Sequence, residues 1–336
     1  MPCSLRRTVP TTRRETILLL GAMAASTVAA RAQPKAMPVI GYLGSESPEP
    51  YGSRLAAFAE GLAEAGYADG RNVTIDFRWA EGQYSRLPSL AMDLAERQVT
   101  VMVAPGGAEV ALAARSASRT IPIVFEMGGD PVALGMVASL SRPGGNLTGV
   151  SSLSVEVSLK RLEFMSELFP AARTFAVAVN PTSPTSGSQS RNLQAAASSL
   201  GLELRLLNAS SEPELERLFA VASEMKLPGL VFTSDPYFAY RSRRLAELAM
   251  HHAMPAITQA RDFPNAGGLM SYGGDFRQSH RHTGIYAGRI IKGEKPSDLP
   301  VQRVTKVELF VNLKAAGQLG LTMPPSILSS ADVVIE

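Results

Sequence analysis

Two stretches, Val124-Phe-Glu-Met-Gly-Gly-Asp-Pro131 and Arg142-Pro-Gly-Gly-Asn-Leu-Thr-Gly-Val-Ser151, decide how this chain is divided. An apolar strand candidate at 121–125 is soon followed by the glycine pair Gly128-Gly129, and another strand candidate lies at 147–150. Glycine permits backbone conformations closed to other residues and Pro131 fixes its own φ, so this segment is typical of a chain that changes direction. We interpret it as the crossing from one α/β lobe to another.

Strand and helix patterns alternate on both sides of this crossing. The helix expected at 51–65 shows the three-to-four spacing of an amphipathic helix, with apolar residues at Leu55, Phe58, Leu62 and Ala65. Strands are expected at 38–43, 73–77, 99–103, 175–179, 202–207 and 229–232. Such an alternation predicts an α/β fold with parallel central sheets and helices on both faces. A length of 336 residues favours two domains.

The first 32 residues have the features of a signal peptide. Arginines precede an apolar run at 17–28, and Ala30-Arg31-Ala32 has the small-x-small form of a cleavage site. The run is shorter than the roughly 20 apolar residues that a membrane span needs, so we expect a protein that does not span the membrane. Residues 12–18 partly resemble a twin-arginine signal, and both Tat and Sec export to the periplasm stay open.

The basic character of the chain belongs largely to this leader. The whole sequence has a formal net charge of +3, whereas residues 33–336 carry 28 Lys and Arg against 29 Asp and Glu, a net charge of −1. A nucleic-acid partner is therefore not expected. Cys3, the only cysteine, also lies in the leader. The mature protein would have no disulfide, no thiol nucleophile and no cysteine metal ligand.

Motifs for catalysis, metals or cofactors find little support. Ser151 lacks the second glycine of a nucleophile elbow, and none of the four histidines sits in an obvious strand-end loop. The pairs His251/His252 and His280/His282 could bind a metal, but we favour solvated helix residues. The glycine-rich segment 143–149 lacks the Lys-Ser/Thr of a P-loop. We therefore predict no catalytic residue, no metal site and no cofactor.

Small or polar residues recur where a strand ends just before a helix. In open α/β sheets, ligands bind beyond the carboxyl ends of the strands, and helix starts attract anionic groups. A ligand-lining set is therefore predicted at Gly44-Ser45, Gly106-Gly107, Gly128-Gly129-Asp130, Ser151-Ser152, Asn180 and Ser234-Asp235.

Several short motifs together resemble one family. They include 121–125, 128–131, 142–146, 148–151 and 160–163, and toward the C-terminus 291–296, 298–300, 312–314, 319–321 and 324–325. With these motifs the chain resembles the uncharacterised ABC-transporter substrate-binding proteins related to the tryptophan/tyrosine-binding TrpX type. Nearly all of the mature chain is covered.

The resemblance implies a type I periplasmic binding protein, with two Rossmann-like lobes joined by a multi-strand hinge. The N-terminal lobe would comprise 37–149 plus 256–295, and the C-terminal lobe 150–255 plus 296–336. Its function would be to bind a small amino-acid-like or carboxylate-bearing ligand, possibly aromatic, and to deliver it to ABC permease subunits. Two alternatives stay open, an exported α/β hydrolase and a soluble ligand-sensing partner of a signalling receptor. We expect a monomer with one ligand site and no enzymatic activity.

An amino-acid-like ligand brings a carboxylate and an ammonium group, and both need partners when buried. For the carboxylate, hydroxyls and backbone N–H groups are expected at likely helix starts, at Ser45, Gly106, Gly107, Ser151 and Ser152. For the ammonium we expect Asp130, with Asp235 as second choice. The alternative for Asp130 is a turn carboxylate that bonds the N–H groups after Pro131. A ring-bearing ligand would use aromatic side chains at strand ends, for which the candidates are Tyr42, Phe125, Tyr237 and Tyr272.

Overall fold

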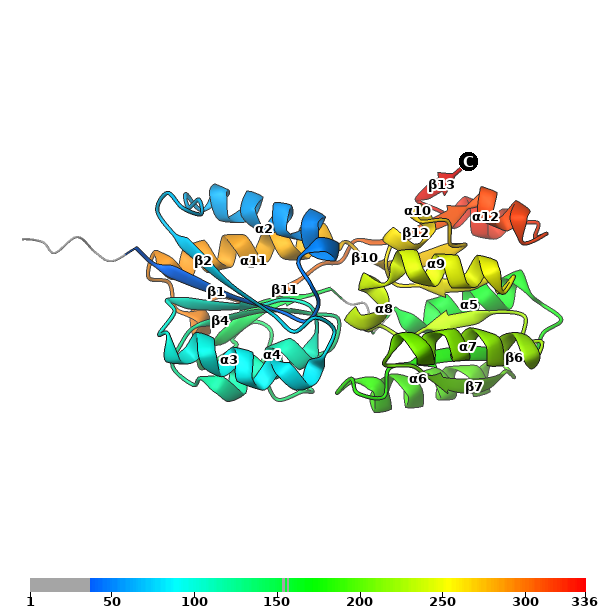
Figure 1. The fold of residues 1–336 in the computed structure, drawn as a ribbon, viewed down its shortest axis with the longest axis horizontal. Coiled ribbons are helices and arrows are strands. Elements are labelled where there is room, and N and C mark those ends of the chain that lie inside the picture. The colour runs from blue at the N-terminus through cyan, green and yellow to red at the C-terminus, as the bar shows by residue number, and fades with distance from the viewer. Residues whose placement is uncertain (1–36, 153–154, 156) are drawn as a thin grey trace, which may run out of the picture. The chain divides into compact units, whose positions relative to one another are not determined.

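The structure, a computed structural model, describes residues 37–152, 155 and 157–336, so the predicted leader lies outside the described residues. Its first lobe contains a six-stranded, fully parallel sheet in the order β11-β5-β4-β3-β1-β2 (Figure 1). The strands are β1 (Val39–Gly44), β2 (Thr74–Trp79), β3 (Val101–Ala104), β4 (Ile123–Met127), β5 (Leu147–Ser151) and β11 (Gln302–Arg303).

Helices cover both faces of this sheet. Its turns and helices are η1 (Glu49–Tyr51), α2 (Gly52–Glu64), η2 (Tyr84–Arg86), α3 (Leu87–Glu96), α4 (Ala108–Ala117), α11 (Phe276–Ile291) and η3 (Pro296–Asp298). Figure 1 shows α2 and α11 on one face and α3 and α4 on the other. Successive strand residues face opposite sides, so Tyr42 packs with the α2 and α11 core and Leu43 with the α3 and α4 core. Burial on both faces explains the continuous apolar runs of these strands.

The second lobe has a seven-stranded sheet in the order β13-β12-β10-β9-β8-β6-β7, parallel except where β12 pairs with β10. Its strands are β6 (Thr174–Val179), β7 (Glu203–Asn208), β8 (Leu230–Phe232), β9 (Ala256–Thr258), β10 (Met270–Gly274), β12 (Val307–Asn312) and β13 (Val333–Ile335). Its helices are α5 (Ser158–Leu168), α6 (Ser186–Ser199), α7 (Glu212–Glu224), α8 (Pro236–Tyr240), α9 (Ser242–His251), α10 (Asp262–Asn265), α12 (Leu313–Gln318) and α13 (Pro325–Ser330). The expected α/β class with two mostly parallel sheets is confirmed.

The chain passes between the two sheets three times, after β5, after β10 and after β11. The resemblance implies a return to the first lobe near residue 256 and a last departure near 296. The strand pairings differ, because β9 and β10 both belong to the second sheet and β11 belongs to the first. The three crossings lie together: Val304 N–H donates to the Ser151 carbonyl, and a Cβ on Gly274 would lie 2.3 Å from the Ser152 carbonyl oxygen.

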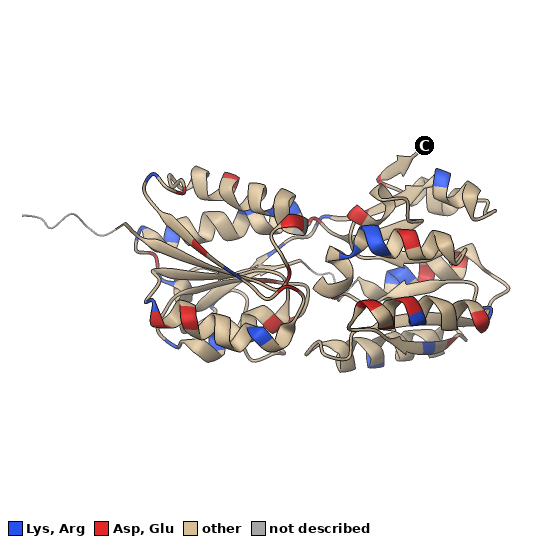
Figure 2. Ribbon diagram, in the orientation of Figure 1, with Lys and Arg blue, Asp and Glu red and all other residues tan. Residues whose placement is uncertain are grey.

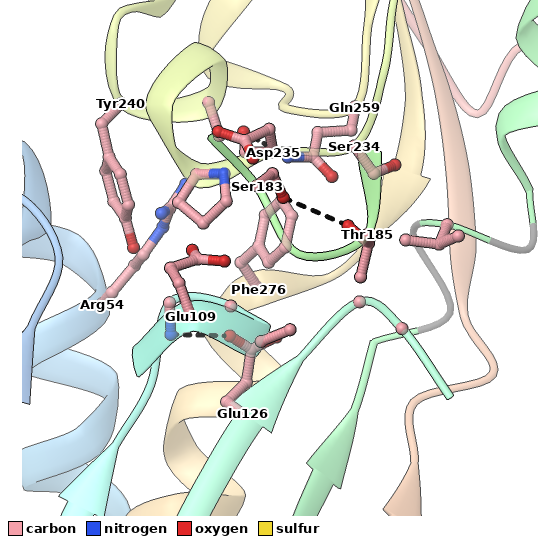
Figure 3. A pocket seen from close by; sticks show the side chains of 18 residues that line it. Arg54, Glu109, Glu126, Ser183, Thr185, Ser234, Asp235, Tyr240, Gln259 and Phe276 are labelled. Carbon is pink, nitrogen blue, oxygen red and sulfur yellow. Dashed lines mark hydrogen bonds between the residues drawn. The ribbon is translucent and has the colours of Figure 1, made fainter. Parts of the chain in front are cut away.

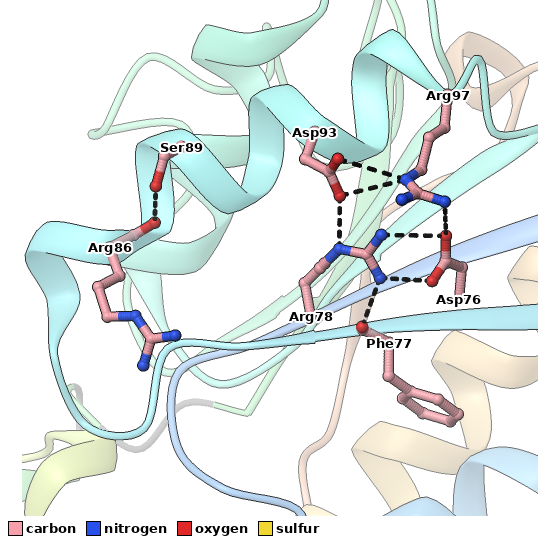
Figure 4. A network of polar contacts seen from close by, with 7 residues as sticks. All are labelled: Asp76, Phe77, Arg78, Arg86, Ser89, Asp93 and Arg97. Carbon is pink, nitrogen blue, oxygen red and sulfur yellow. Dashed lines mark hydrogen bonds and ion pairs between the residues drawn. The ribbon is translucent and has the colours of Figure 1, made fainter.

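A charged network covers β2, the edge strand of the first sheet (Figure 4). Arg78 pairs with Asp76 on the same strand and with Asp93 of α3, and Arg97 pairs with both aspartates. Charged side chains on an edge strand oppose pairing with another chain. Elsewhere, Figure 2 shows basic and acidic positions interspersed along the helices of both lobes. Among the described residues, no helix has both the length and the apolar character that crossing a bilayer requires.

Helices α2 and α11 approach so closely that glycine is required on both. A Cβ at Gly284 would lie 2.1 Å from the Phe58 carbonyl oxygen, and one at Gly61 would lie 1.9 Å from the Arg281 carbonyl oxygen. Both clashes are with backbone atoms, which cannot rotate away. The helices would have to move apart to admit a methyl group.

Gly284→Ala should therefore lower the free energy of unfolding by about 1–3 kcal/mol, the usual cost of overpacking, although alanine is the better helix former. Urea denaturation measures this change. The control is Gly52→Ala at the start of α2, where a Cβ would meet nothing within 4 Å. An unchanged denaturation midpoint for Gly284→Ala would contradict the close approach of the two helices.

Candidate functional site

A pocket lies where strand ends of the two sheets meet, within the single compact unit formed by residues 38–336 (Figure 3). The first lobe contributes the loops after β3 and β4 and residues of α2, α4 and α11, and the second contributes the loops after β6, β8 and β9 together with α8. These loops follow the carboxyl ends of parallel strands, as the sequence analysis expected of a ligand site.

Gly106 and Gly107 shape the first-lobe wall. Both have positive φ angles, +98° and +118°, which favour glycine. A Cβ on Gly106 would lie 2.3 Å from the Tyr51 hydroxyl oxygen, and one on Gly107 would lie 2.2 Å from Oε1 of Glu109. The turn into α4 can therefore bring its backbone up to the pocket only with glycine at both positions.

Arg54 of α2 brings a positive charge to the pocket and is 4% exposed. Its guanidinium carbon lies 4.3 Å from the ring centroid of Tyr240 and 4.8 Å from that of Phe276. Cation–π contacts of this kind hold a guanidinium in place without neutralising it. An ion pair joins Nη2 of Arg54 to Oδ2 of Asp262 at 3.5 Å, and that carboxylate is largely exposed. Arg54 can therefore still accept an anionic group of a ligand.

Asp235 lies on the second-lobe side of the pocket, at the start of α8, and is 1% exposed. Its Oδ1 accepts hydrogen bonds from Tyr237 N–H at 2.9 Å, Asn180 Nδ2 at 3.0 Å and the Tyr84 hydroxyl at 3.0 Å. Its Oδ2 is buried with no hydrogen-bond partner within the described part of the chain. Burial raises the pKa of this carboxyl, and the hydrogen bond from Asn180 opposes the rise.

Two glutamates of the first lobe complete the acidic lining. Glu126, at 3% exposure, accepts from Gly106 N–H at 3.3 Å through Oε2, and Glu109 stands in the first turn of α4. Oε1 of each is buried and has no partner among the residues described. Burial raises the pKa of both carboxyls, and the nearby charge of Asp235 adds to the rise for Glu109. The pocket thus presents unpaired carboxylate oxygens from both lobes.

Two further contacts join the lobes beside the pocket. Arg241 of the second lobe pairs with Glu46 of the first at 2.9 Å and with Glu212 at 2.7 Å, and its guanidinium lies over the Tyr237 ring. The Tyr84 hydroxyl of the first lobe donates to Asp235, as described above. Both contacts are polar, so water could replace either partner in them.

The residues predicted from the sequence fall into three groups. The predicted residues that line the pocket are Gly106, Gly107, Gly128, Gly129, Ser234 and Asp235. Others lie one layer behind lining residues: Ser45 bonds the Tyr51 hydroxyl, Ser152 interacts with the Glu126 carboxyl, and Asn180 donates to Asp235. Ser151 is buried in β5, and the structure does not bring it to the pocket surface.

Asp130 and Tyr272 are not brought to the pocket. Asp130 is exposed, and its Oδ1 accepts from Val132 N–H at 2.8 Å and Ala133 N–H at 3.3 Å, which is the arrangement of the turn alternative. Tyr272 packs edge-on against Phe164. The other aromatic candidates, Tyr42, Phe125 and Tyr237, do not line the pocket either. The aromatic side chains that do line it are Tyr240 and Phe276.

The expectation of solvated histidines is wrong for His280. This residue is fully buried in α11, and its Nδ1 lies 2.9 Å from the Phe276 carbonyl oxygen, to which it donates. Burial lowers its pKa to about 3, so the ring is neutral. Over the described residues, no three His, Cys, Asp or Glu side chains are grouped as a metal site would need.

The charged lining residues Arg54, Glu109 and Glu126 were not predicted from the sequence. Glu126 carried a readable signal, because a carboxylate inside an apolar strand must find a partner or face a site. Arg54 carried another, since it stands four residues before Phe58 on the buried face of its helix. Glu109 and Tyr240 sit at ordinary helix positions and carried no comparable signal.

Comparisons with known proteins agree with this architecture. A tyrosine-binding protein from Clostridioides difficile (strain R20291) is 28% identical over 257 residues, which cover 76% of this chain and 73% of the relative. Among solved structures, one from Streptococcus pneumoniae in complex with L-Trp has a TM-score of 0.79 at 27% identity. A ligand-free, open substrate-binding protein with adhesive properties from Clostridium difficile has a TM-score of 0.61 at 26% identity. Each structure covers 89% of this chain and is itself covered to 99%.

The family model described as ABC transporter substrate binding protein matches residues 52–335. This span includes both sheets almost entirely, from the start of α2 to the end of β13. The fold is that of type I periplasmic binding proteins, as the resemblance implied. The chain therefore belongs to the ABC transporter substrate-binding protein family.

Proposed function

We propose that this protein binds a small zwitterionic, amino-acid-like ligand between its lobes and delivers it to an ABC permease. One observation carries the proposal: the pocket presents a buried cation, Arg54, and a buried carboxylate oxygen without a partner, on Asp235, from opposite lobes. Arg54 would bind the ligand carboxylate, and Asp235 with Glu109 would bind the ammonium. Each ligand charge then gains a partner that offsets its desolvation. The tyrosine-binding relative supports an amino-acid ligand.

The ligand would enter by separation of the lobes. The pocket leaves about 40 Å³ for the centres of water molecules, and one water needs roughly 10–15 Å³ by this measure, so a few waters fit but an amino acid does not. We propose that the lobes turn about the three crossings after β5, β10 and β11. At similar identity, the higher TM-score to the L-Trp complex than to the ligand-free, open structure supports lobes that lie close together here rather than open.

Substrate-binding proteins of ABC importers act outside the cytoplasmic membrane, and this chain shares their family. We propose that it works in the periplasm after Tat or Sec export, as a monomer and without catalysis. A monomer leaves both lobes free to move when the cleft closes.

The first test concerns charge recognition. An amino acid that binds the parent protein should bind at least tenfold more tightly than its carboxamide, since a hydrogen bond to a charged group is worth about 1.5–3 kcal/mol. Arg54→Gln should remove this preference. Isothermal titration with the twenty common amino acids and the amides of those that bind measures both effects.

The control is Arg277→Gln on α11, where the arginine is exposed and pairs with Glu60. Thermal unfolding verifies that both variants are folded. If Arg54→Gln still prefers acid over amide as the parent does, the carboxylate assignment is wrong. If no amino acid binds the parent, the proposed function itself is wrong.

The second test concerns Glu46, which contacts Arg241 of the other lobe. Burial raises the pKa of the Glu46 carboxyl from 4.5 to about 7, and the charge of Arg241 offsets only part of this rise. Because the pKa of Glu46 is higher in the folded state than in the unfolded state, the folded protein binds this proton more tightly. The resulting contribution to stability is complete below pH 4.5 and is lost as the pH rises to 7. Relative to Glu46→Gln, the free energy of unfolding of the parent should therefore fall by about 3 kcal/mol at most over that window.

Urea denaturation of both proteins between pH 4.5 and 8 measures the difference. Titrating groups that do not interact with Glu46, such as His280, contribute equally to parent and variant and cancel. Glu49→Gln, an exposed neighbour, is the control and should follow the parent. Parallel pH profiles for Glu46→Gln and the parent would show that Glu46 titrates normally.

A further inference from the structure

Glu126 has no role in the recognition of a zwitterion, although it lines the same pocket. It lies at the end of β4, it is 3% exposed, and Oε2 accepts from Gly106 N–H. Oε1 is buried and has no hydrogen-bond partner among the described residues. Figure 3 shows its carboxyl on the first-lobe side, below Glu109 and Phe276 and away from Asp235. A ligand that satisfies Arg54 and Asp235 still leaves this oxygen unpaired.

The charges of the pocket point the same way. The lining residues with a formal charge are one arginine, Arg54, and three acids, Glu109, Glu126 and Asp235, which sum to −2. Arg241 does not line the pocket, and it already pairs with Glu46 and Glu212. Arg161 lies behind Ser234, to which it donates at 2.7 Å. A neutral zwitterion brings only one cationic group to these three acids, so at least one buried acid would be left without a cationic partner.

The aromatic side chains are poorly placed to stack on a ligand ring. The Tyr240 ring has Arg54 over it at 4.3 Å and is stacked with Tyr51 at a centroid distance of 4.3 Å. Phe276 also has Arg54 near its ring. These rings hold the guanidinium, so the pocket favours a charged ligand side chain over an aromatic one.

We propose that the ligand carries a second cationic group, on its side chain, that binds Glu126. This inference rests on the proposed function and specifies the ligand class as a basic amino acid or a close analogue, with a net positive charge. Glu126 is then a specificity-determining residue: its Oε1 accepts a hydrogen bond from the side-chain cation, while Gly106 N–H holds Oε2. The ammonium at Asp235 and Glu109 and the second cation at Glu126 give the acidic lining two cationic partners, so the formal charge of pocket and ligand together is −1 instead of −2.

The test compares near-isosteric probes on the purified protein. Isothermal titration is performed with L-lysine, L-ornithine and L-arginine, and with L-norleucine, L-tyrosine and L-tryptophan as neutral probes. The best basic probe should bind at least tenfold more tightly than every neutral one. L-norleucine is the sharpest comparison, because it lacks only the terminal ammonium of L-lysine. This part of the test needs no variant, so it stands even if substitutions at Glu126 impair folding.

Glu126→Gln keeps the size and one acceptor oxygen but removes the charge. It should weaken binding of the basic probe by roughly ten- to hundredfold relative to binding of L-norleucine, so that the preference for the basic probe is lost. Glu163→Gln, an exposed glutamate of α5, is the control and should bind like the parent. Thermal unfolding without ligand verifies that the variants fold.

Two outcomes overturn the inference: a neutral probe that binds the parent as tightly as the basic ones, or a Glu126→Gln protein that keeps the full preference for basic probes. Neutral binding with an Arg54-dependent preference for acid over amide leaves the proposed function standing while this inference fails. If none of the amino acids binds, both fail.

Discussion

The pocket depends on one hydrogen-bonding centre, Oδ1 of Asp235. It caps α8 through Tyr237 N–H, fixes the loop after β6 through Asn180 and accepts the Tyr84 hydroxyl of the other lobe. A buried carboxylate oxygen with three donors is well solvated by the protein. Its second oxygen is therefore the one that the proposed ligand would bind, so the same side chain would serve helix capping, lobe contact and recognition.

The sequence predicted the fold class well, because the fold class follows from short-range patterns of apolar residues. The apolar runs of strands such as Val101–Ala104 reflect burial on both faces, and the spacing of Phe58 and Leu62 reflects one buried helix face. The crossings were harder. Ala256–Thr258 and Met270–Gly274 look like strands of either lobe, and only pairing partners far along the chain decide their sheet. A local pattern carries no information about that choice.

The site divides in a similar way. Strand-end glycines and Asp235 could be found because strand topology places them at the ligand-binding edge. Asp130 also follows a strand end, but its carboxylate accepts hydrogen bonds from the N–H groups after Pro131 and is not brought to the pocket. Arg54 and Phe276 come from α2 and α11, which meet only in the folded lobe. Arg54 and Phe276 meet only because these two helices, more than two hundred residues apart in the sequence, pack against each other.

The late position of α11 in the chain has a kinetic consequence. The first five strands of the first lobe are complete by residue 151, but the helix that packs against α2 through Gly284 begins only at Phe276. The sixth strand, β11, comes later still. Contacts of such long sequence separation form slowly, because the closing of a large loop precedes any gain from them. An emerging chain would therefore expose Tyr42 of β1 and Phe58 of α2 until α11 has been synthesised. During this period, association with other chains competes with folding.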